Sequence, residues 1–259
     1  MIAIEKHLAQ FGVSKPKYTR FLQQVSVLCA QIDQSNIPCI LNAIVLMVEL
    51  HIDQKPRPDG TEYIEHPLSI AIKVLEAMAI FDCEILIATL LHDTVEDQTA
   101  KLLQKTTIPV KNSKNKQKLA LDVIENYTSI RVRNIVSALT NPDFDQILKE
   151  EGIKRGDARY SLRTNQLYVE HLANVMQNTD AALIKIFDFD GNALNLNAIH
   201  DDNKRIKLKM KYVPGFQIII QRLNDNTQPL NMTQKTKDAL LYKFTAAYND
   251  LKNNNDLII

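Results

Sequence analysis

Apolar residues recur every three or four positions along most of the 259-residue chain. This spacing places them on one face of an α-helix. Runs that alternate every second residue are few, and the chain holds only six glycines, which disfavours an architecture of strands and tight turns. We therefore predict an all-α fold that forms a single domain over residues 1–259. The predicted helices cover residues 17–32, 37–52, 67–79, 83–95, 129–139, 160–177, 180–198, 203–224 and 233–251.

Polar segments interrupt this pattern and predict loops at 54–63, 106–118 and 140–146. The first of them combines two prolines with an Asp-Gly pair, which is typical of a turn. Pro67 lies in the first turn of a predicted helix, where its missing N–H does no harm. Asp82 precedes an apolar helical segment, and either Asp82 or its neighbour is a candidate N-cap residue.

Charge and composition narrow the range of functions. The chain has 31 basic and 30 acidic residues, a net charge of +1, so no overall basic character points to a nucleic-acid partner. The beginning of the chain lacks a basic segment followed by an apolar one, so we expect no signal peptide. The longest apolar run, 37–50, is too short to span a bilayer. We predict a soluble cytoplasmic protein with no membrane partner. Its three cysteines are predicted to be reduced, and their spacing is not that of a metal site. They are Cys29, Cys39 and Cys83.

One mostly apolar stretch carries an unusual set of metal-binding side chains. Buried charge is costly unless it is paired or bound to a metal. On the helix predicted around residues 83–97, His92 and Glu96 share a face, as do Asp93 and Asp97. His92 and Asp93 are adjacent, so they reach one ion only near a helix end or a kink, with further ligands such as His66 arriving from elsewhere. Imidazole and carboxylate ligands suit Mn²⁺, Fe²⁺ or Zn²⁺.

A further ligand should come from a distant carboxylate on an apolar helix. The segment "ALIKIFDFDGNALNL" supplies Asp188, with Asn192 one turn later. An isolated His-Asp pair is common by chance. Two histidines, a His-Asp pair and a later Asp on an apolar helix are together a more specific indication of a metal site.

Three motifs resemble a known family. "GTEYIEHP", "ATLLHDTVED" and "ALIKIFDFDGNALNL" are similar to the three signatures of the hydrolase half of the Rel/Spo family, the HD-type enzymes that degrade (p)ppGpp. The similarity runs over roughly residues 40–225, and nothing resembles the synthetase half. The resemblance implies an HD-domain helical bundle with a metal site in its core, flanked by extra N- and C-terminal helices, acting as a stand-alone small alarmone hydrolase.

The resemblance also implies a role for each motif residue. The acidic pair that activates the attacking water falls on Glu96 and Asp97. The substrate-binding residues fall on Arg57, with Lys55 as an alternate, and on Asn192. One Mn²⁺ ion per chain is the implied cofactor, and its ligands fall on His66, His92, Asp93 and Asp188.

The chain departs from the family pattern in its last motif. That motif usually reads close to "LADRLHNMRTL"; here Leu194 replaces the Arg that follows the Asn, and Gly191 enters the turn. The preference for base or phosphate therefore stays open. The leading interpretation is a 3′-pyrophosphohydrolase of ppGpp and pppGpp. Its alternatives are an HD phosphohydrolase of another nucleotide, such as an adenine alarmone, and a protein that binds alarmones without turnover. His51 is interpreted as structural.

Overall fold

The computed structural model describes residues 6, 8–13, 16–106, 116–193 and 201–253. Within these residues the secondary structure is helical, without a β-strand, and the predicted all-α class is confirmed. The chain divides into two compact units, Met1–Thr140 and Asn141–Ile259. The single hydrolase domain over 1–259 stays a prediction.

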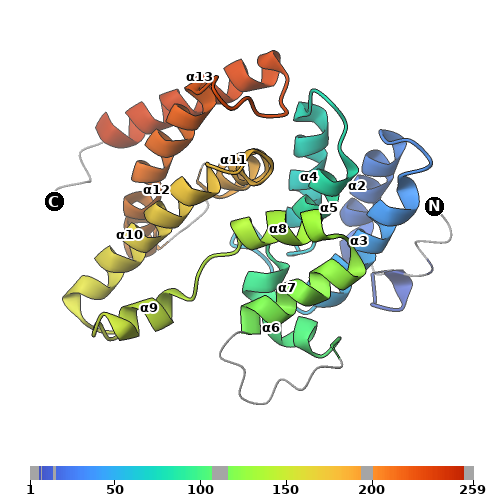
Figure 1. The fold of residues 1–259 in the computed structure, drawn as a ribbon, viewed down its shortest axis with the longest axis horizontal. Coiled ribbons are helices and arrows are strands. Elements are labelled where there is room, and N and C mark those ends of the chain that lie inside the picture. Colours follow the sequence, from blue (N-terminus) through green and yellow to red (C-terminus); the bar gives the residue numbers. More distant parts are fainter. Residues whose placement is uncertain (1–5, 7, 14–15, 107–115, 194–200, 254–259) are drawn as a thin grey trace. The chain divides into compact units, whose positions relative to one another are not determined.

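The first unit is built around one short apolar helix, α5 (Cys83–Leu90), in which every residue from Ile85 to Leu90 is buried. It packs against α3, α4 and α8 (Figure 1). Its N-cap is Asp82, as predicted, because the Asp82 carboxylate accepts hydrogen bonds from the backbone N–H of Glu84 (3.0 Å) and Ile85 (3.2 Å). The other elements of this unit are η1 (Pro16–Tyr18), α2 (Thr19–Ala30), α3 (Ile37–His51), α4 (Glu65–Ala77), α6 (Thr94–Leu103), α7 (Lys116–Tyr127) and α8 (Ile130–Leu139).

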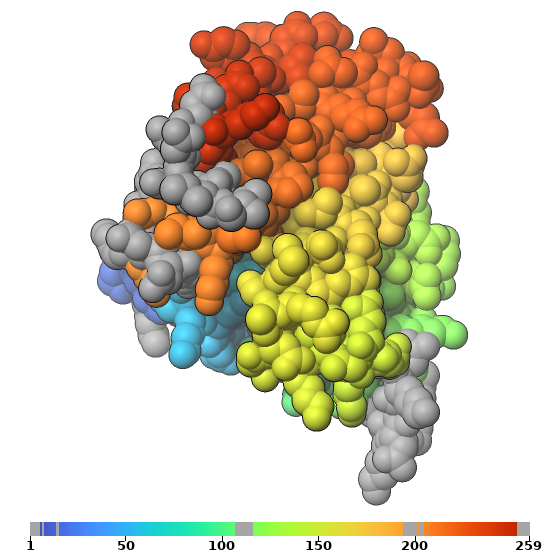
Figure 2. Space-filling view, turned by 90° about the vertical axis from the view of Figure 1, so that its left-hand side faces the viewer, coloured from blue at the N-terminus to red at the C-terminus, as the bar shows by residue number. Residues whose placement is uncertain are grey.

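The second unit packs its helices around α12, which contacts α10, α11 and α13. Figure 2 shows the orange α12 and the red-orange α13 lying against each other. An aromatic cluster fills this core, in which the Phe189 ring meets Tyr212, Phe216 and Phe244 edge to face at 5.0–6.1 Å. A Cβ at Gly215 would lie 2.7 Å from the Phe189 ring, so α11 and α12 approach closely only because this residue is glycine. The elements are α9 (Phe144–Glu150), α10 (Ala158–Val175), α11 (Thr179–Ala193), α12 (Asp202–Asn224) and α13 (Gln234–Asn253).

Three predicted segments differ from the structure. The helix predicted over 83–95 is two helices, because α5 ends at Leu90 and α6 begins at Thr94. The loop predicted over 106–118 is shorter, because α7 begins at Lys116. The first turn of α7 is polar, so its start shows no helical spacing of apolar residues. The loop predicted over 140–146 gives way to α9 at Phe144; this helix has seven residues, too few for a clear period. The helix predicted over 180–198 is described as far as Ala193.

In the described parts of the chain, none of the helices has both the length and the apolar character needed to cross a bilayer.

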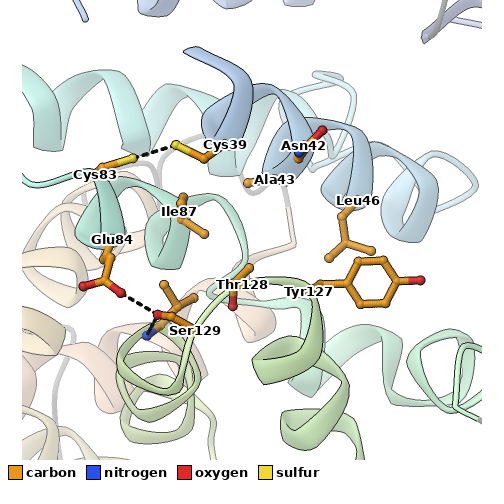
Figure 3. Close-up of a pocket in the computed structure, with 11 residues that line it drawn as sticks. Cys39, Asn42, Ala43, Leu46, Cys83, Glu84, Ile87, Tyr127, Thr128 and Ser129 are labelled. Carbon is orange, nitrogen blue, oxygen red and sulfur yellow. Dashed lines mark hydrogen bonds between the residues drawn. The ribbon is translucent and has the colours of Figure 1, made fainter. Parts of the chain in front are cut away.

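A cavity of about 280 Å³ lies between α3, α5 and the turn that joins α7 to α8 (Figure 3). None of the predicted site residues lines it. The thiol sulfurs of Cys39 and Cys83 lie at its edge, 3.0 Å apart, and both residues are half-buried. Opposite them, the Ser129 hydroxyl caps α8 and donates to the Glu84 carboxylate. All three cysteines are free thiols, as predicted.

Cys83 should be an unreactive thiol. Burial, together with the hydrogen bond to Cys39, raises its pKa to about 12. Because the thiolate is the nucleophile, we expect Cys83 to react with iodoacetamide at pH 8 roughly 10²-fold more slowly than a free cysteine, after allowing for the greater nucleophilicity of a high-pKa thiolate. Mass spectrometry of the alkylated peptide gives the rate. Labelling as fast as that of free cysteine would contradict this assignment, and Cys39→Ala should accelerate it.

Candidate metal centre

The break between α5 and α6 creates the centre of this site. Leu91, His92 and Asp93 form the turn between the two helices. The backbone carbonyl of Asp93 accepts the N–H of Asp97 at 2.9 Å, which starts α6, while the Asp93 side chain makes no capping hydrogen bond. The carboxylate of Asp93 is therefore not used to cap the helix. A turn of this kind is the local geometry in which two adjacent side chains can face one ion.

Two histidine rings face the Asp93 carboxylate from different elements. His92 lies in the same turn, and its Nε2 is 3.2 Å from Oδ1 of Asp93. His66 lies in the first turn of α4, and its Nε2 is 3.6 Å from Oδ2. Both rings are buried, with centroids 5.5 Å apart. Each oxygen of one carboxylate thus faces a different imidazole nitrogen.

The chemistry of these three side chains fits a divalent ion. Nδ1 of His92 lies 2.8 Å from the Thr89 carbonyl, and a hydrogen bond donated there leaves the Nε2 lone pair directed at Asp93. The ligand nitrogens of His66 and His92 lie within 4.8 Å of each other. Around an ion with bonds of roughly 2.1–2.2 Å, neighbouring ligand atoms lie roughly 3.0–3.6 Å apart, which matches the two nitrogen–oxygen distances.

Asp188 lies in the second unit, on α11. It is buried, and its carboxylate accepts hydrogen bonds from the Lys185 ammonium at 2.7 Å and the Asn192 amide at 2.6 Å. Like His66 and His92, it is a buried side chain of a type that holds metal ions. Lys185 was not among the predicted site residues. The sequence could have indicated Lys185, because it is a charged residue within an apolar run, three residues before Asp188 and on the same helix face.

The acidic pair lies in the first turn of α6. Glu96 and Asp97 are both exposed. The carboxylate of Asp97 accepts hydrogen bonds from the Tyr63 hydroxyl at 2.7 Å and the Gln54 amide at 2.8 Å. The helix expected to place His92 and Glu96 on one face is not continuous, because His92 precedes α6 instead of belonging to it. Glu96 lies instead in the first turn of α6, three residues after Asp93.

The predicted substrate-binding residues lie in two places. Arg57 is half-buried in the loop between α3 and α4, where its backbone carbonyl and N–H close a turn with Gly60 and Thr61 at 2.8 Å each. Gly60 adopts a φ of 83°, which a residue with a side chain adopts rarely. Lys55 is exposed in the same loop. Asn192 lies on α11, and Leu194 falls outside the described residues.

Comparison with known proteins identifies relatives of one kind. No protein-family model matches the chain. Three relatives are named guanosine-3′,5′-bis(diphosphate) 3′-pyrophosphohydrolase MESH1. The Xenopus tropicalis protein is 30% identical over 155 residues, covering 60% of this chain and 67% of the relative. The Danio rerio and Homo sapiens proteins are each 39% identical over 64 residues, covering 24% of this chain. This chain thus spans 36% of the length of those two relatives. The chain therefore belongs, as a distant member, to the family that contains these MESH1 proteins.

Proposed function

We propose that this protein is a Mn²⁺-dependent hydrolase that removes the 3′-pyrophosphate of ppGpp and pppGpp, giving pyrophosphate and GDP or GTP. The observation that carries the proposal is the position of the Asp93 carboxylate, whose two oxygens face His92 and His66 separately. The printed names of the relatives supply the substrate class.

The proposed ligands of the ion are His66, His92, Asp93 and Asp188. The first three lie together in the first unit, and Asp188 joins the set as a buried carboxylate that Lys185 and Asn192 hold in one orientation. When bound, a divalent ion supplies Lewis-acid polarisation of the phosphate and lowers the pKa of coordinated water.

The two carboxylates of the acidic pair have different roles in this proposal. Glu96 accepts the proton of the attacking water, since it presents an exposed carboxylate at the start of α6. Asp97 is held by Tyr63 and Gln54, so it orients neighbouring groups. The water oxygen forms a bond to the phosphorus attached to the 3′ oxygen. The bond between that phosphorus and the 3′ oxygen then breaks, and the 3′ oxygen leaves as a hydroxyl by taking the proton that Glu96 accepted from the water.

Arg57 binds the phosphate groups of the substrate, with Lys55 beside it in the same loop. A guanidinium pairs with two phosphate oxygens at once, whereas an ammonium acts as a compact charge. Asn192 contacts the nucleotide while it holds Asp188.

Arg57→Ala should raise KM and leave kcat nearly unchanged. A charge-assisted hydrogen bond contributes about 1.5–3 kcal/mol, so we expect KM to rise roughly 10–100-fold. Lys55→Ala is the matched control and should raise KM less, because Lys55 is exposed and lacks the planar guanidinium. Steady-state release of pyrophosphate gives both constants. An unchanged KM in Arg57→Ala would remove this residue from the phosphate site.

A second candidate is hydrolysis of an adenine alarmone or another nucleotide. Gly191 and Leu194 favour it, since they depart from the usual family motif at positions on either side of Asn192. A panel of ppGpp, pppGpp and their adenine analogues, with Mn²⁺ and product identification, separates the candidates. The proposal expects the guanine compounds to give the highest kcat/KM. Preference for the adenine analogues supports the second candidate, and tight binding without product supports a non-catalytic alarmone-binding protein.

A further inference from the structure

The hydroxyl of Tyr63 bridges two carboxylates of the candidate site. Its oxygen lies 2.7 Å from Oδ2 of Asp93 and 2.7 Å from Oδ2 of Asp97. Tyr63 lies in the turn that precedes α4, three residues before His66, whose ring it meets at 5.9 Å. A hydroxyl has one proton and donates to one acceptor at a time. Two carboxylates this close to one hydroxyl are stabilised by a cation beside them, which a metal on Asp93 would supply.

Gln54 holds Asp97 from another direction. Its amide nitrogen donates to Oδ2 of Asp97 at 2.8 Å. Its amide oxygen lies 2.8 Å from the donating Nε2 of Gln98 and 2.6 Å from Nδ1 of His51. The opposite orientation of the amide would set an oxygen against the Asp97 carboxylate and a nitrogen against Gln98, so the contacts define which end faces which partner.

His51 explains how the Tyr63 ring is held. His51 is fully buried at the end of α3, where burial lowers its pKa, and its Nδ1 lies 2.6 Å from the Gln54 amide oxygen, which can only accept a hydrogen bond. Its ring stacks on Tyr63 with centroids 5.0 Å apart and planes 18° from parallel. The structural role predicted for His51 thus consists of contacts to both Tyr63 and Gln54.

The backbone of α6 changes direction just after Asp97. Gln98 has φ −125° and ψ 25°, values outside the helical range. The first turn of α6, which carries Glu96 and Asp97, is therefore set apart from the rest of the helix by a kink. The Gln98 side chain donates to the Gln54 amide oxygen and so joins this turn to the segment just after α3.

We propose that Tyr63 and Gln54 are positioning residues of the metal centre, an inference that rests on the proposed function. Tyr63 sets the rotation of the Asp93 carboxylate, so that Oδ1 faces His92 while Oδ2 faces His66. Gln54 fixes Asp97 against the same hydroxyl. The geometry of a metal ligand and the placement of a reaction carboxylate are thereby linked through one phenol.

The test is Mn²⁺ affinity in the absence of substrate, measured by calorimetry on the purified full chain. Tyr63→Phe removes only the hydroxyl, and we expect the Kd for Mn²⁺ to rise roughly 10–100-fold, the scale seen when a group that orients a metal ligand is lost. Gln54→Ala should give a smaller rise, because it acts on Asp97. Tyr127→Phe, at an exposed tyrosine of the same unit, is the matched control and should bind Mn²⁺ as the wild type does.

Excess Mn²⁺ separates positioning from ligation. Tyr63→Phe should recover full Mn²⁺ occupancy at high metal concentration, whereas Asp93→Ala should not. A Kd for Tyr63→Phe equal to that of Tyr127→Phe overturns the proposal. Failure to load Mn²⁺ at any concentration, with thermal unfolding of the metal-free protein unchanged, also overturns it, because Tyr63 is then a ligand. A wild type that binds Mn²⁺ yet releases no pyrophosphate overturns the proposed function alone.

Discussion

His92→Ala and Asp93→Ala should each lose most of the bound Mn²⁺ and all measurable hydrolysis of ppGpp. Each substitution deletes one proposed ligand, and the remaining groups cannot replace it: His92 and Asp93 occupy a three-residue turn whose backbone is set by the helices on either side. Elemental analysis of the purified variants gives the metal content, and pyrophosphate release gives the turnover.

The matched control for Asp93→Ala is Asp33→Ala, since Asp33 is an exposed aspartate of the same unit. It should keep the metal content and turnover of the wild type. Normal Mn²⁺ content and normal turnover in either His92→Ala or Asp93→Ala would exclude the proposed centre.

Glu96→Gln should keep its Mn²⁺ and lose turnover. The substitution preserves the shape of the side chain and removes its negative charge and its proton acceptor. We expect kcat to fall roughly 10²–10⁴-fold, the usual scale for a lost general base. Metal content and substrate binding should stay near wild type, because Glu96 is outside the proposed set of two His and two Asp. Pre-steady-state turnover with Mn²⁺ at saturation measures the effect.

Glu76→Gln, at an exposed glutamate of α4, serves as the control and should be fully active. Loss of Mn²⁺ from Glu96→Gln would make Glu96 a ligand and require another base. Full activity would show that the water needs no carboxylate at this position.

The regular part of the fold was predictable from the sequence. Helical spacing of apolar residues gave the all-α class, and Asp82 capped α5 as its sequence position indicated. The break at residues 91–93 was not predictable from hydropathy. Leu90, Leu91 and Val95 are all buried, so the apolar pattern continues through the turn as if the helix did. Residues 91–93, which form the turn, do not interrupt the helical spacing of apolar residues.

The side chains proposed to bind the metal were predictable from the sequence, but the hydrogen bonds that hold the site in place were not. The motifs indicated His66, His92 and Asp93, and the structure brings these three together in the first unit. The motifs did not indicate a role for Tyr63 or Gln54, although Tyr63 lies inside the first motif. Their contacts join Asp97 to residues 34 and 43 positions earlier. Polar contacts over such separations follow no sequence period, so they become visible only in the folded chain.

Removing and restoring the ion tests whether release of the 3′-pyrophosphate depends on the metal. Purified wild-type protein is stripped with a chelator, divided, and incubated with ppGpp with and without added Mn²⁺, while GDP and pyrophosphate are quantified by ion-exchange chromatography. We expect equal amounts of GDP and pyrophosphate in the sample with Mn²⁺ and neither product in the stripped sample. Undiminished hydrolysis in the stripped sample, or no pyrophosphate at saturating Mn²⁺, would contradict the proposed function.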